Sequence, residues 1–328
     1  MRVVITGAAG FIGRKLTAAL LRQGQLMQAA TGSAQHPAPI SELVLADQMD
    51  FAAPSTRTGN IPVRKVIGDL CEAGYRQHLF EGGVGTLFHL AASLTTEAER
   101  DIARGIETNV LSLLGLLELC RAQKTAPRFI FASSIATFGG TLPDVVDDTT
   151  AQTPQTSYGA HKVIAEQLVS DYSRHGVLDG RCLRLPIVVI RPRAGRSVSD
   201  SVAAILREPL NGDNTDCPFR PETTLPLVSI QAVVRGLLKL HDLSADTIGA
   251  FRAFNLPALR VTAAEMAAAV QAWPQRKPGQ VNWRPDAQMQ AIVDGWPARF
   301  DSVRARQLGI LPDASLTEII DAYLKDAP

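Results

Sequence analysis

The sequence predicts an α/β fold in which a doubly wound parallel sheet is followed by a smaller, mixed C-terminal part. Two observations predict it. Strand and helix patterns alternate through residues 1–190, and this alternation is typical of βαβ units with parallel strands. After Arg191 the pattern breaks into short segments punctuated by proline. We therefore expect one domain over residues 1–190 and a smaller region over residues 191–328.

The chain opens with a strand, a glycine-rich turn and a helix. Residues 2–6 form a β-branched run, and Gly7, Gly10 and Gly13 follow with G-x-x-G-x-x-G spacing. Such a turn directs backbone N–H groups and a helix dipole at a pyrophosphate, although an ordinary structural turn is the alternative. The predicted cofactor contacts in the turn are Gly7, Gly10, Phe11, Ile12 and Gly13.

The second strand of such a fold ends in an acid that binds the adenosine ribose. Asp47 stands at the tip of the strand pattern 42–47. It comes later than the usual distance of about 20 residues, because residues 25–41 indicate a longer connection rich in Ala, Pro, Gly and Ser. A carboxylate there repels a 2′-phosphate and so predicts NAD over NADP. Arg57 and Arg64 are basic alternatives for holding a phosphate, and an ordinary strand-end acid is the alternative to the ribose role.

Further strand ends provide the remaining predicted cofactor contacts. Strands are predicted over residues 62–67, 85–90, 128–132 and 181–190, with helices over residues 106–121 and 157–175. The carboxyl ends of parallel strands meet at one edge of a sheet, and ligands bind there. The predicted contacts at these ends are Asp69, Leu70, Ala91, Ala92, Ser93, Pro186 and Ile187.

A tyrosine and a lysine four residues apart stand near the start of the helix pattern 157–175. On a helix, Tyr158 and Lys162 lie on one face, about 5–6 Å apart at Cβ. A nearby cation favours the ionised phenol and lowers its pKa from about 10, so the pair suits proton exchange with an alcohol or a ketone. An exposed helix pair without chemistry is the alternative.

Composition excludes several classes of protein. The 328 residues are 46% hydrophobic with a formal net charge of +1, which predicts a globular enzyme and gives no electrostatic reason to bind nucleic acid. No apolar stretch reaches the roughly 18–20 residues that span a bilayer. The cysteines are scattered without a C-x-x-C pair, which favours reduced thiols over disulfides or a metal site. We expect a cytoplasmic protein with no membrane or nucleic-acid partner and no metal.

Taken together, these motifs resemble the extended short-chain dehydrogenase/reductase family, also called the NAD-dependent epimerase/dehydratase family. The resemblance is based on residues 7–13 and 89–92 and on Ser134, Tyr158 and Lys162. It implies a Rossmann fold with tightly held NAD(P), and Asp47 favours NAD. Tyr158 matches the catalytic base, Lys162 the lysine that holds the nicotinamide ribose, and Ser134 the hydroxyl that bonds the reacting oxygen. Asn109 matches a helix asparagine that lines the cofactor site, with an ordinary polar helix residue as the alternative.

Two departures from the family pattern concern the substrate. Members that act on nucleotide sugars carry an asparagine where residues 183–187 have an apolar side chain, and an arginine that residues 224–231 lack. A pocket without both is poorly suited to a diphosphate, because buried charge needs a partner. Other segments resemble the branch that oxidises a small sugar acid, D-erythronate, at its C2 hydroxyl. These segments are residues 138–146, 171–174, 184–192, 207–210 and 296–301.

The predicted function is therefore NAD-dependent oxidation of the C2 hydroxyl of a small sugar acid. The predicted catalytic residues are Ser134, Tyr158, Lys162 and Asn109. Arg191 and Arg193 are candidates to hold the substrate carboxylate, with surface arginines as the alternative. A nucleotide-sugar epimerase or dehydratase with tightly bound NAD, and a non-catalytic NAD-binding protein, remain as alternatives. The family also implies a homodimer formed through the helices near residues 94–120 and 157–175.

Overall fold

The computed structural model describes residues 1–29, 35–52, 61–189, 197–273 and 277–326. The chain forms two compact units that are interleaved along the sequence. Unit 1 comprises residues 1–134, 156–184 and 234–254, and unit 2 comprises residues 135–155, 185–233 and 255–328. The chain thus passes between the units several times, whereas the sequence predicts one boundary at residue 190.

Unit 1 is built on a seven-stranded sheet in the order β12–β8–β7–β6–β1–β4–β5. Its strands are β1 (Arg2–Thr6), β4 (Glu42–Asp47), β5 (Val63–Ile67), β6 (Thr86–His89), β7 (Arg128–Ser134), β8 (Asp179–Leu185) and β12 (Ala253–Asn255). β1 pairs in parallel with β4 on one side and with β6 on the other. β4 in turn pairs in parallel with β5, and β6 with β7. Thr6 is level with Ala46 and with His89, so these strands end at one edge. The strand order reverses direction between β1 and β6, and the predicted doubly wound Rossmann sheet is confirmed.

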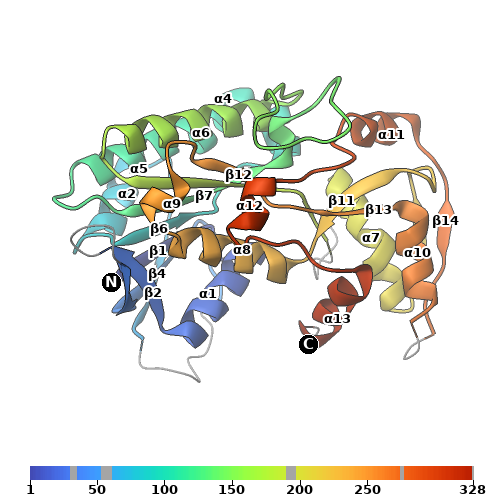
Figure 1. The fold of residues 1–328 in the computed structure, drawn as a ribbon, viewed down its shortest axis with the longest axis horizontal. Helices are drawn as coiled ribbons and strands as arrows, with labels where there is room; N and C mark the ends of the chain where they lie inside the picture. The colour runs from blue at the N-terminus through green and yellow to red at the C-terminus, as the bar shows by residue number, and fades with distance from the viewer. Residues whose placement is uncertain (30–34, 53–60, 190–196, 274–276, 327–328) are drawn as a thin grey trace. The chain divides into compact units, whose positions relative to one another are not determined.

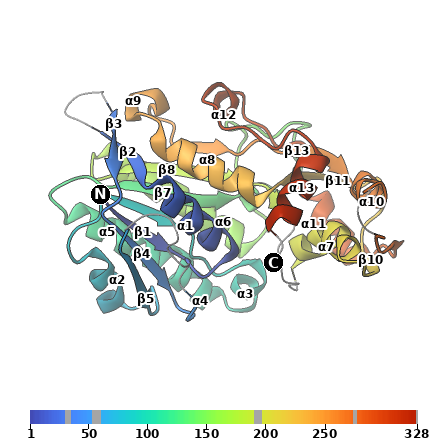
Figure 2. The ribbon, with the colours of Figure 1, turned by 90° about the horizontal axis from the view of Figure 1, so that it is seen from below.

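Helices cover both faces of this sheet, as Figures 1 and 2 show. One face carries α1 (Phe11–Gln23) and the unit 1 part of α8 (Ile230–Asp242), and the other carries α2 (Ala73–Phe80), α5 (Ser112–Arg121) and α6 (Ser157–Arg174). The shorter helices are α3 (Thr95–Arg100), α4 (Ile102–Ile106), the π-helix η1 (Glu107–Leu111) and α9 (Ala245–Ile248). None of the helices in the described ranges has the length and hydropathy needed to cross a bilayer.

A hydrophobic core of unit 1 lies between the sheet and the second of these helix layers. Val4, Val44, Leu87 and Phe129 from the strands pack with Leu113, Leu117, Ala165 and Val169 from α5 and α6, all fully buried. Each large side chain buried here stabilises the fold by about 1.5–3 kcal/mol. This core fixes α6 against β7, and these two elements carry Tyr158 and Ser134.

The segment 25–41, predicted as a longer connection before the second strand, contains two antiparallel strands, the β2–β3 hairpin, which the sequence did not predict. β2 (Gln25–Ala29) pairs antiparallel with β3 (Gln35–Pro39). Contacts distant in sequence hold it: the Met27 N–H donates to the Asp242 carboxylate over 3.1 Å, and Arg128 Nη1 donates to the Met27 carbonyl over 2.9 Å. The sequence did not reveal the hairpin because its partners lie more than a hundred residues away.

Unit 2 is mixed, as predicted for the C-terminal part. Its strands form the sheets β13–β11–β9 and β10–β14, namely β9 (Ile187–Val188), β10 (Thr215–Cys217), β11 (Thr224–Val228), β13 (Leu259–Thr262) and β14 (Val281–Trp283). Its helices are η2 (Ile135–Thr137), α7 (Val198–Leu210), α10 (Ala263–Gln271), α11 (Ala287–Asp294), α12 (Val303–Gln307) and α13 (Leu316–Asp326).

The predicted strand over residues 181–190 is divided in the structure. β8 ends at Leu185 and belongs to the large sheet, whereas β9 starts at Ile187 and pairs in parallel with β11. The break falls at Pro186, which has no N–H to continue a ladder of hydrogen bonds. The expectation of one continuous strand is therefore wrong.

Candidate active site

The glycine-rich turn links β1 to α1 at the carboxyl edge of the sheet in unit 1. Gly7 has a φ of 72°, a conformation that side chains with a Cβ rarely adopt, and its carbonyl accepts from the Gly10 N–H over 3.1 Å. Gly10 is the N-cap of α1, and within the described residues the first turn of that helix has no acidic side chain and no side-chain cap. The N–H groups of Phe11 and Ile12 therefore begin a helix whose dipole favours an anion.

The glycines are required by close packing as well as by backbone conformation. A Cβ on Gly13 would lie 2.3 Å from the Gly7 carbonyl oxygen, and a Cβ on Gly7 would lie 2.8 Å from the Ala91 nitrogen. Neither contact is possible for real atoms, so both positions need glycine. The turn, the helix and the segment after β6 form a tight cradle of main-chain atoms, which fits a pyrophosphate that needs close backbone approach.

Asp47 lies at the end of β4, beside the glycine turn. Its Oδ2 accepts from the Ala9 N–H over 2.8 Å, and its Oδ1 accepts from the Met49 N–H over 3.0 Å. Each carboxylate oxygen has two lone pairs, so a further donor such as a ribose hydroxyl can be accepted as well. The geometry is compatible with the role predicted from the sequence.

The segment after β5 is held by an ion pair with α4. Asp69 Oδ2 bonds Arg104, and its Oδ1 accepts from the Cys71 N–H over 2.9 Å. Burial raises the pKa of the Asp69 carboxyl, but the Cys71 bonds and Arg104 outweigh that effect and hold the pKa below its usual value. Asp69 is therefore an anion at neutral pH, and Leu70 follows it, partly buried against the core of unit 1.

Asn109 lies on the π-helical turn η1 and binds the segment after β6. Its Oδ1 accepts from the Ser93 N–H over 2.8 Å and its Nδ2 donates to the Ser93 carbonyl over 2.9 Å. The same Nδ2 lies 3.3 Å from Nδ1 of the buried His161. The amide thus fixes the backbone at Ser93, the end of the Ala91–Ser93 segment. The sequence predicted one regular helix here, whereas the structure has a π turn, a feature frequent at functional sites.

The predicted catalytic side chains come together at the end of β7. Ser134 is the last residue of β7, and Tyr158 lies in the first turn of α6, which packs on that strand. Lys162 follows one turn later, and its Nζ lies 5.5 Å from the centre of the Tyr158 ring. Lys162 Nζ also donates to the Ala132 carbonyl over 2.7 Å. The structure therefore places the phenol, the ammonium and the serine hydroxyl on two elements in direct contact.

Lys162 is 4% exposed, and its surroundings are mostly apolar. Its Nζ lies 4.4 Å from the centre of the Phe131 ring, whose other neighbours include the stacked ring of His89. Burial is the main cause that lowers the pKa of Lys162 to about 8, against the charge of Glu166, which raises it. Burial is the main cause that lowers the pKa of His89 to about 3, and the charge of Lys162 lowers it further, so this imidazole is neutral. Among the contacts described, its hydrogen bond is with Thr6 Oγ1, 2.7 Å from Nδ1.

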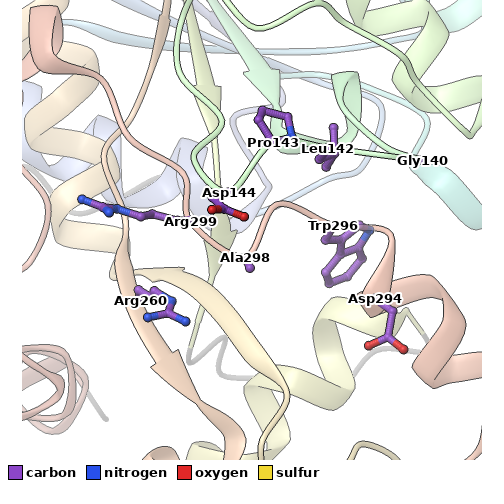
Figure 3. Close-up of a pocket in the computed structure, with 9 residues that line it drawn as sticks. All are labelled: Gly140, Leu142, Pro143, Asp144, Arg260, Asp294, Trp296, Ala298 and Arg299. Atoms are coloured by element: carbon purple, nitrogen blue, oxygen red, sulfur yellow. The ribbon is translucent and has the colours of Figure 1, made fainter.

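Unit 2 holds the remaining predicted residues and a separate pocket. Pro186 lies between β8 and β9, and the buried Ile187 is the first residue of β9. Arg191 and Arg193 fall outside the described residues. A pocket of about 440 Å³ is lined in part by residues of the segments 138–146 and 296–301, both of which resemble the sugar-acid branch of the family (Figure 3). Its lining is Gly140, Leu142, Pro143, Asp144, Arg260, Asp294, Trp296, Ala298 and Arg299.

The pocket in unit 2 carries charges of both signs. Asp294 is paired with Arg220 over 3.0 Å, and the guanidinium of Arg299 is directed away from Trp296 (Figure 3). The two segments are joined because the Val146 N–H donates to the Arg299 carbonyl over 2.9 Å. None of the residues that line this pocket was predicted as part of the site.

Comparison with known proteins decides the family. The model of the NAD dependent epimerase/dehydratase family matches residues 3–244, which include the glycine turn, Ser134, Tyr158 and Lys162. The chain belongs to this family. It is an NAD-dependent oxidoreductase of the short-chain dehydrogenase/reductase type.

Several members of the family match this epimerase/dehydratase chain over its full length. D-erythronate dehydrogenase from Cupriavidus necator is 41% identical over 333 residues, covering 100% of this chain and 99% of the relative. D-erythronate dehydrogenase from Haemophilus influenzae is 35% identical and covers 99% of each chain. Among solved structures, a nucleoside-diphosphate-sugar epimerase from Agrobacterium tumefaciens has a TM-score of 0.89 and 33% identity, covering 99% of this chain and 94% of that one.

Three residues near the active site of this family member were not predicted. Glu166, one turn beyond Lys162, is 1% exposed and pairs with Arg184 over 2.8 Å. Ser133, next to Ser134, donates from its hydroxyl to the same carboxylate. The spacing of Glu166 after Lys162 was a usable signal, because a glutamate on the apolar face of a helix needs a buried partner.

Proposed function

We propose that this chain is an NAD-dependent dehydrogenase that oxidises the C2 hydroxyl of a small sugar acid, such as D-erythronate, to the 2-oxo acid. The observation that carries the proposal is the placement of Tyr158 over the buried Lys162, at the strand end that carries Ser134. The names of the two full-length relatives supply the substrate class.

In this mechanism Tyr158 is the base. The Lys162 ammonium beside the phenol favours the tyrosinate, which removes the proton of the substrate hydroxyl. Ser134 donates a hydrogen bond to the same substrate oxygen and orients it. When bound, NAD accepts the hydride that leaves the substrate carbon. The proton passes to Tyr158 and onward to solvent, so the oxidation releases NADH, a 2-oxo acid and a proton.

The residues that would hold NAD are those of the cradle in unit 1. The backbone of Gly7–Gly13 would bind the pyrophosphate, and Asp47 would accept from the adenosine ribose. Asp69 and Leu70 would flank the adenine, and the Ala91–Ser93 segment, fixed by Asn109, would face the nicotinamide half. Pro186 and Ile187 of unit 2 remain predicted contacts. Lys162 keeps donors beyond the one that bonds Ala132, and these would bind the nicotinamide ribose.

The carboxylate of the substrate needs a cationic partner, because burying it unpaired is costly. Arg191 and Arg193 are proposed for this role on sequence grounds, since a planar guanidinium binds a carboxylate with two parallel hydrogen bonds.

A nucleotide-sugar epimerase is the second candidate, favoured by the name of the 33% identical structure. Two observations disfavour it. Ile187 stands near the position of the family's asparagine and is buried in the apolar core of unit 2. The β11 segment Thr224–Val228 offers no arginine to a diphosphate. Within the described residues, neither segment provides the polar groups that such a substrate requires.

A screen for NADH formation separates the two candidates. Purified enzyme with NAD is offered four-carbon sugar acids in one set of reactions and nucleotide sugars in another. A dehydrogenase accumulates NADH in step with the oxo acid, whereas an epimerase uses its NAD as oxidant and then reductant and accumulates none. Conversion of a nucleotide sugar without NADH would refute the proposal.

We also propose that the chain forms a homodimer through α4, η1 and α6. Large apolar side chains are exposed there: Ile102 is 58% exposed, Leu111 53% and Ile164 45%. Single exposed apolar residues are common, but several on neighbouring helices of one unit indicate a surface that another protein covers. A second copy of the same chain is the occupant that the family implies.

A further inference from the structure

The carboxylate of Glu166 lies in the interior of unit 1, where an unpaired charge is strongly disfavoured. Its Oε2 accepts from Arg184 Nη2 over 2.8 Å, and Arg184 Nε lies 3.0 Å from each of the two carboxylate oxygens. Ser133 Oγ donates to Oε1. A buried charge is retained at a position when it is paired and fully hydrogen-bonded, as this one is. The network joins α6 to the ends of β7 and β8.

Glu166 is also the anion nearest in sequence to Lys162 on the buried face of α6. Residues four apart on a helix are neighbours, about 5–6 Å apart at Cβ. The other ionisable groups that face Lys162 are Tyr158 on α6, His89 on β6, and Cys182 and Arg184 on β8. His89 is neutral, and burial raises the pKa of the Cys182 thiol well above its usual value. Glu166 is therefore the negative charge that acts on the Lys162 ammonium at neutral pH.

We propose that Glu166 is a positioning residue whose carboxylate keeps the buried Lys162 charged, and through Lys162 keeps the Tyr158 phenol ionisable. The inference depends on the proposed roles of Tyr158 and Lys162. Burial alone drives Lys162 toward the neutral amine, and a neutral amine does not favour a tyrosinate. Tyr158 and Lys162 titrate as a coupled pair, so one proton can reside on either the phenol or the amine. The Glu166 carboxylate favours the form in which Lys162 holds the proton and Tyr158 is ionised.

We expect loss of the Glu166 charge to make Tyr158 harder to ionise, whereas a direct electrostatic effect on the phenol would make it easier to ionise. Removing the charge of Glu166 would by itself make Tyr158 easier to ionise, but Tyr158 is eight residues away, about 12 Å along the helix. Lys162 is one turn away, so the effect transmitted through Lys162 dominates. Loss of the carboxylate should therefore make Tyr158 harder to ionise.

The test is an ultraviolet titration of tyrosinate in the cofactor-free enzyme, which needs no turnover. Each variant is compared with its own Tyr158→Phe version, so that the difference reports Tyr158 alone. Tyr75 and Tyr172 have a pKa of about 12, because of burial and of Glu118 respectively, and stay silent at lower pH.

Two substitutions at Glu166 separate charge from shape. Glu166→Gln keeps the shape and loses the charge, whereas Glu166→Asp keeps the charge and shortens the reach to Ser133 and Arg184. We expect Glu166→Gln to move the Tyr158 titration up by about one pH unit and to lower kcat at neutral pH about tenfold with little change in substrate KM. Glu166→Asp should leave the titration close to that of the wild type.

The outcomes are distinct. If Glu166→Gln does not fold because Arg184 is left unpaired, the double variant Glu166→Gln/Arg184→Gln removes both charges. Loss of the Arg184 cation partly offsets loss of the carboxylate, so the upward shift should be smaller than in Glu166→Gln but still present. A titration of Glu166→Gln, or of the double variant, that coincides with the wild type overturns the inference. A larger shift in Glu166→Asp than in Glu166→Gln also overturns it, because shape would then matter more than charge. Full turnover by Tyr158→Phe would instead refute the proposed function.

Discussion

Lys162 Nζ donates a 2.7 Å hydrogen bond to the carbonyl oxygen of Ala132, two residues before Ser134. This bond ties the helix that carries Tyr158 to the strand end that carries Ser134. The lysine therefore has a structural and an electrostatic role in the same place, since its ammonium also lies below the Tyr158 ring at 5.5 Å from the ring centre. A base and a hydrogen-bond donor that act on one substrate oxygen must be held in register, and this contact helps to do so.

Substitution of Gly13 should weaken cofactor binding. In Gly13→Ala the new Cβ would lie 2.3 Å from the Gly7 carbonyl oxygen, so the turn must deform. We expect the Kd for NAD to rise at least about tenfold, equivalent to about 1.4 kcal/mol, with a lower melting temperature. Gly74→Ala is the matched control, because nothing lies within 4 Å of its Cβ and it stands in helix α2. Unaltered NAD binding in Gly13→Ala would show that the turn does not hold the pyrophosphate.

Asp47 should set the preference for NAD over NADP. Asp47→Asn keeps an oxygen that can accept from the Ala9 N–H but removes the charge that repels a 2′-phosphate. The ratio of the Kd for NADP to the Kd for NAD should fall about tenfold, measured by calorimetric titration of both cofactors. If the ratio stays the same, the carboxylate does not face the ribose.

The dimer should dissociate when charge is placed on its proposed face. Leu111→Glu introduces a carboxylate into an apolar interface, and sedimentation velocity should show a shift from dimer to monomer. Val303→Glu is the control. Val303 is an exposed apolar residue, 69% accessible, but it belongs to α12 of unit 2 and not to α4, η1 or α6. A wild type that sediments as a monomer at all concentrations would refute the interface.

Two buried histidines should make the fold sensitive to acid. Burial is the main cause that lowers the pKa of His89 to about 3 and of His241 to about 4, whereas both protonate near pH 6.5 in the unfolded chain. The unfolded state therefore binds more protons below pH 6.5, and stability falls as the pH falls from 6.5 toward 4. Each histidine should remove about 1.4 kcal/mol per pH unit in this range.

Urea denaturation between pH 7 and pH 5 measures this loss. His241→Gln should flatten the pH dependence, although the protein is less stable because Thr86 and Asp242 lose their partner. His36→Gln, at an exposed position in β3, should leave the slope unchanged. A wild-type free energy of unfolding that is independent of pH over this range would contradict the assignment of neutral buried histidines.

The features that were predictable from sequence are local ones. Gly7–Gly13, Asp47 and Ser134 stand at strand ends, and the parallel order of the strands brings strand ends together without further information. The i, i+4 spacing of Tyr158 and Lys162 needs only a helix to place them on one face. The doubly wound sheet follows from the same alternation of patterns.

The features that were missed depend on contacts between distant segments. The β2–β3 hairpin is fixed by Arg128 and Asp242, and the π turn at Asn109 is stabilised by its contacts with Ser93 and His161. The pairing of Glu166 with Arg184 needs the register of α6 against β8. Periodicity along one segment carries no information on such pairings.

Tyr158→Phe should lose at least about 10²-fold in turnover while it still binds NAD, because only the ionisable hydroxyl is removed. Tyr172→Phe is the control: its hydroxyl bonds Glu118 on α5, and the loss of that bond should affect stability rather than turnover.

The most direct test of the proposed reaction follows the hydride itself. D-erythronate labelled with deuterium at C2 is incubated with NAD and enzyme, and the reduced cofactor is analysed by mass spectrometry. Oxidation at C2 transfers the deuterium to the nicotinamide and leaves a 2-oxo acid, and Tyr158→Phe should suppress both products together. Reduced cofactor without deuterium, or no reduced cofactor from any sugar acid, would contradict the proposal.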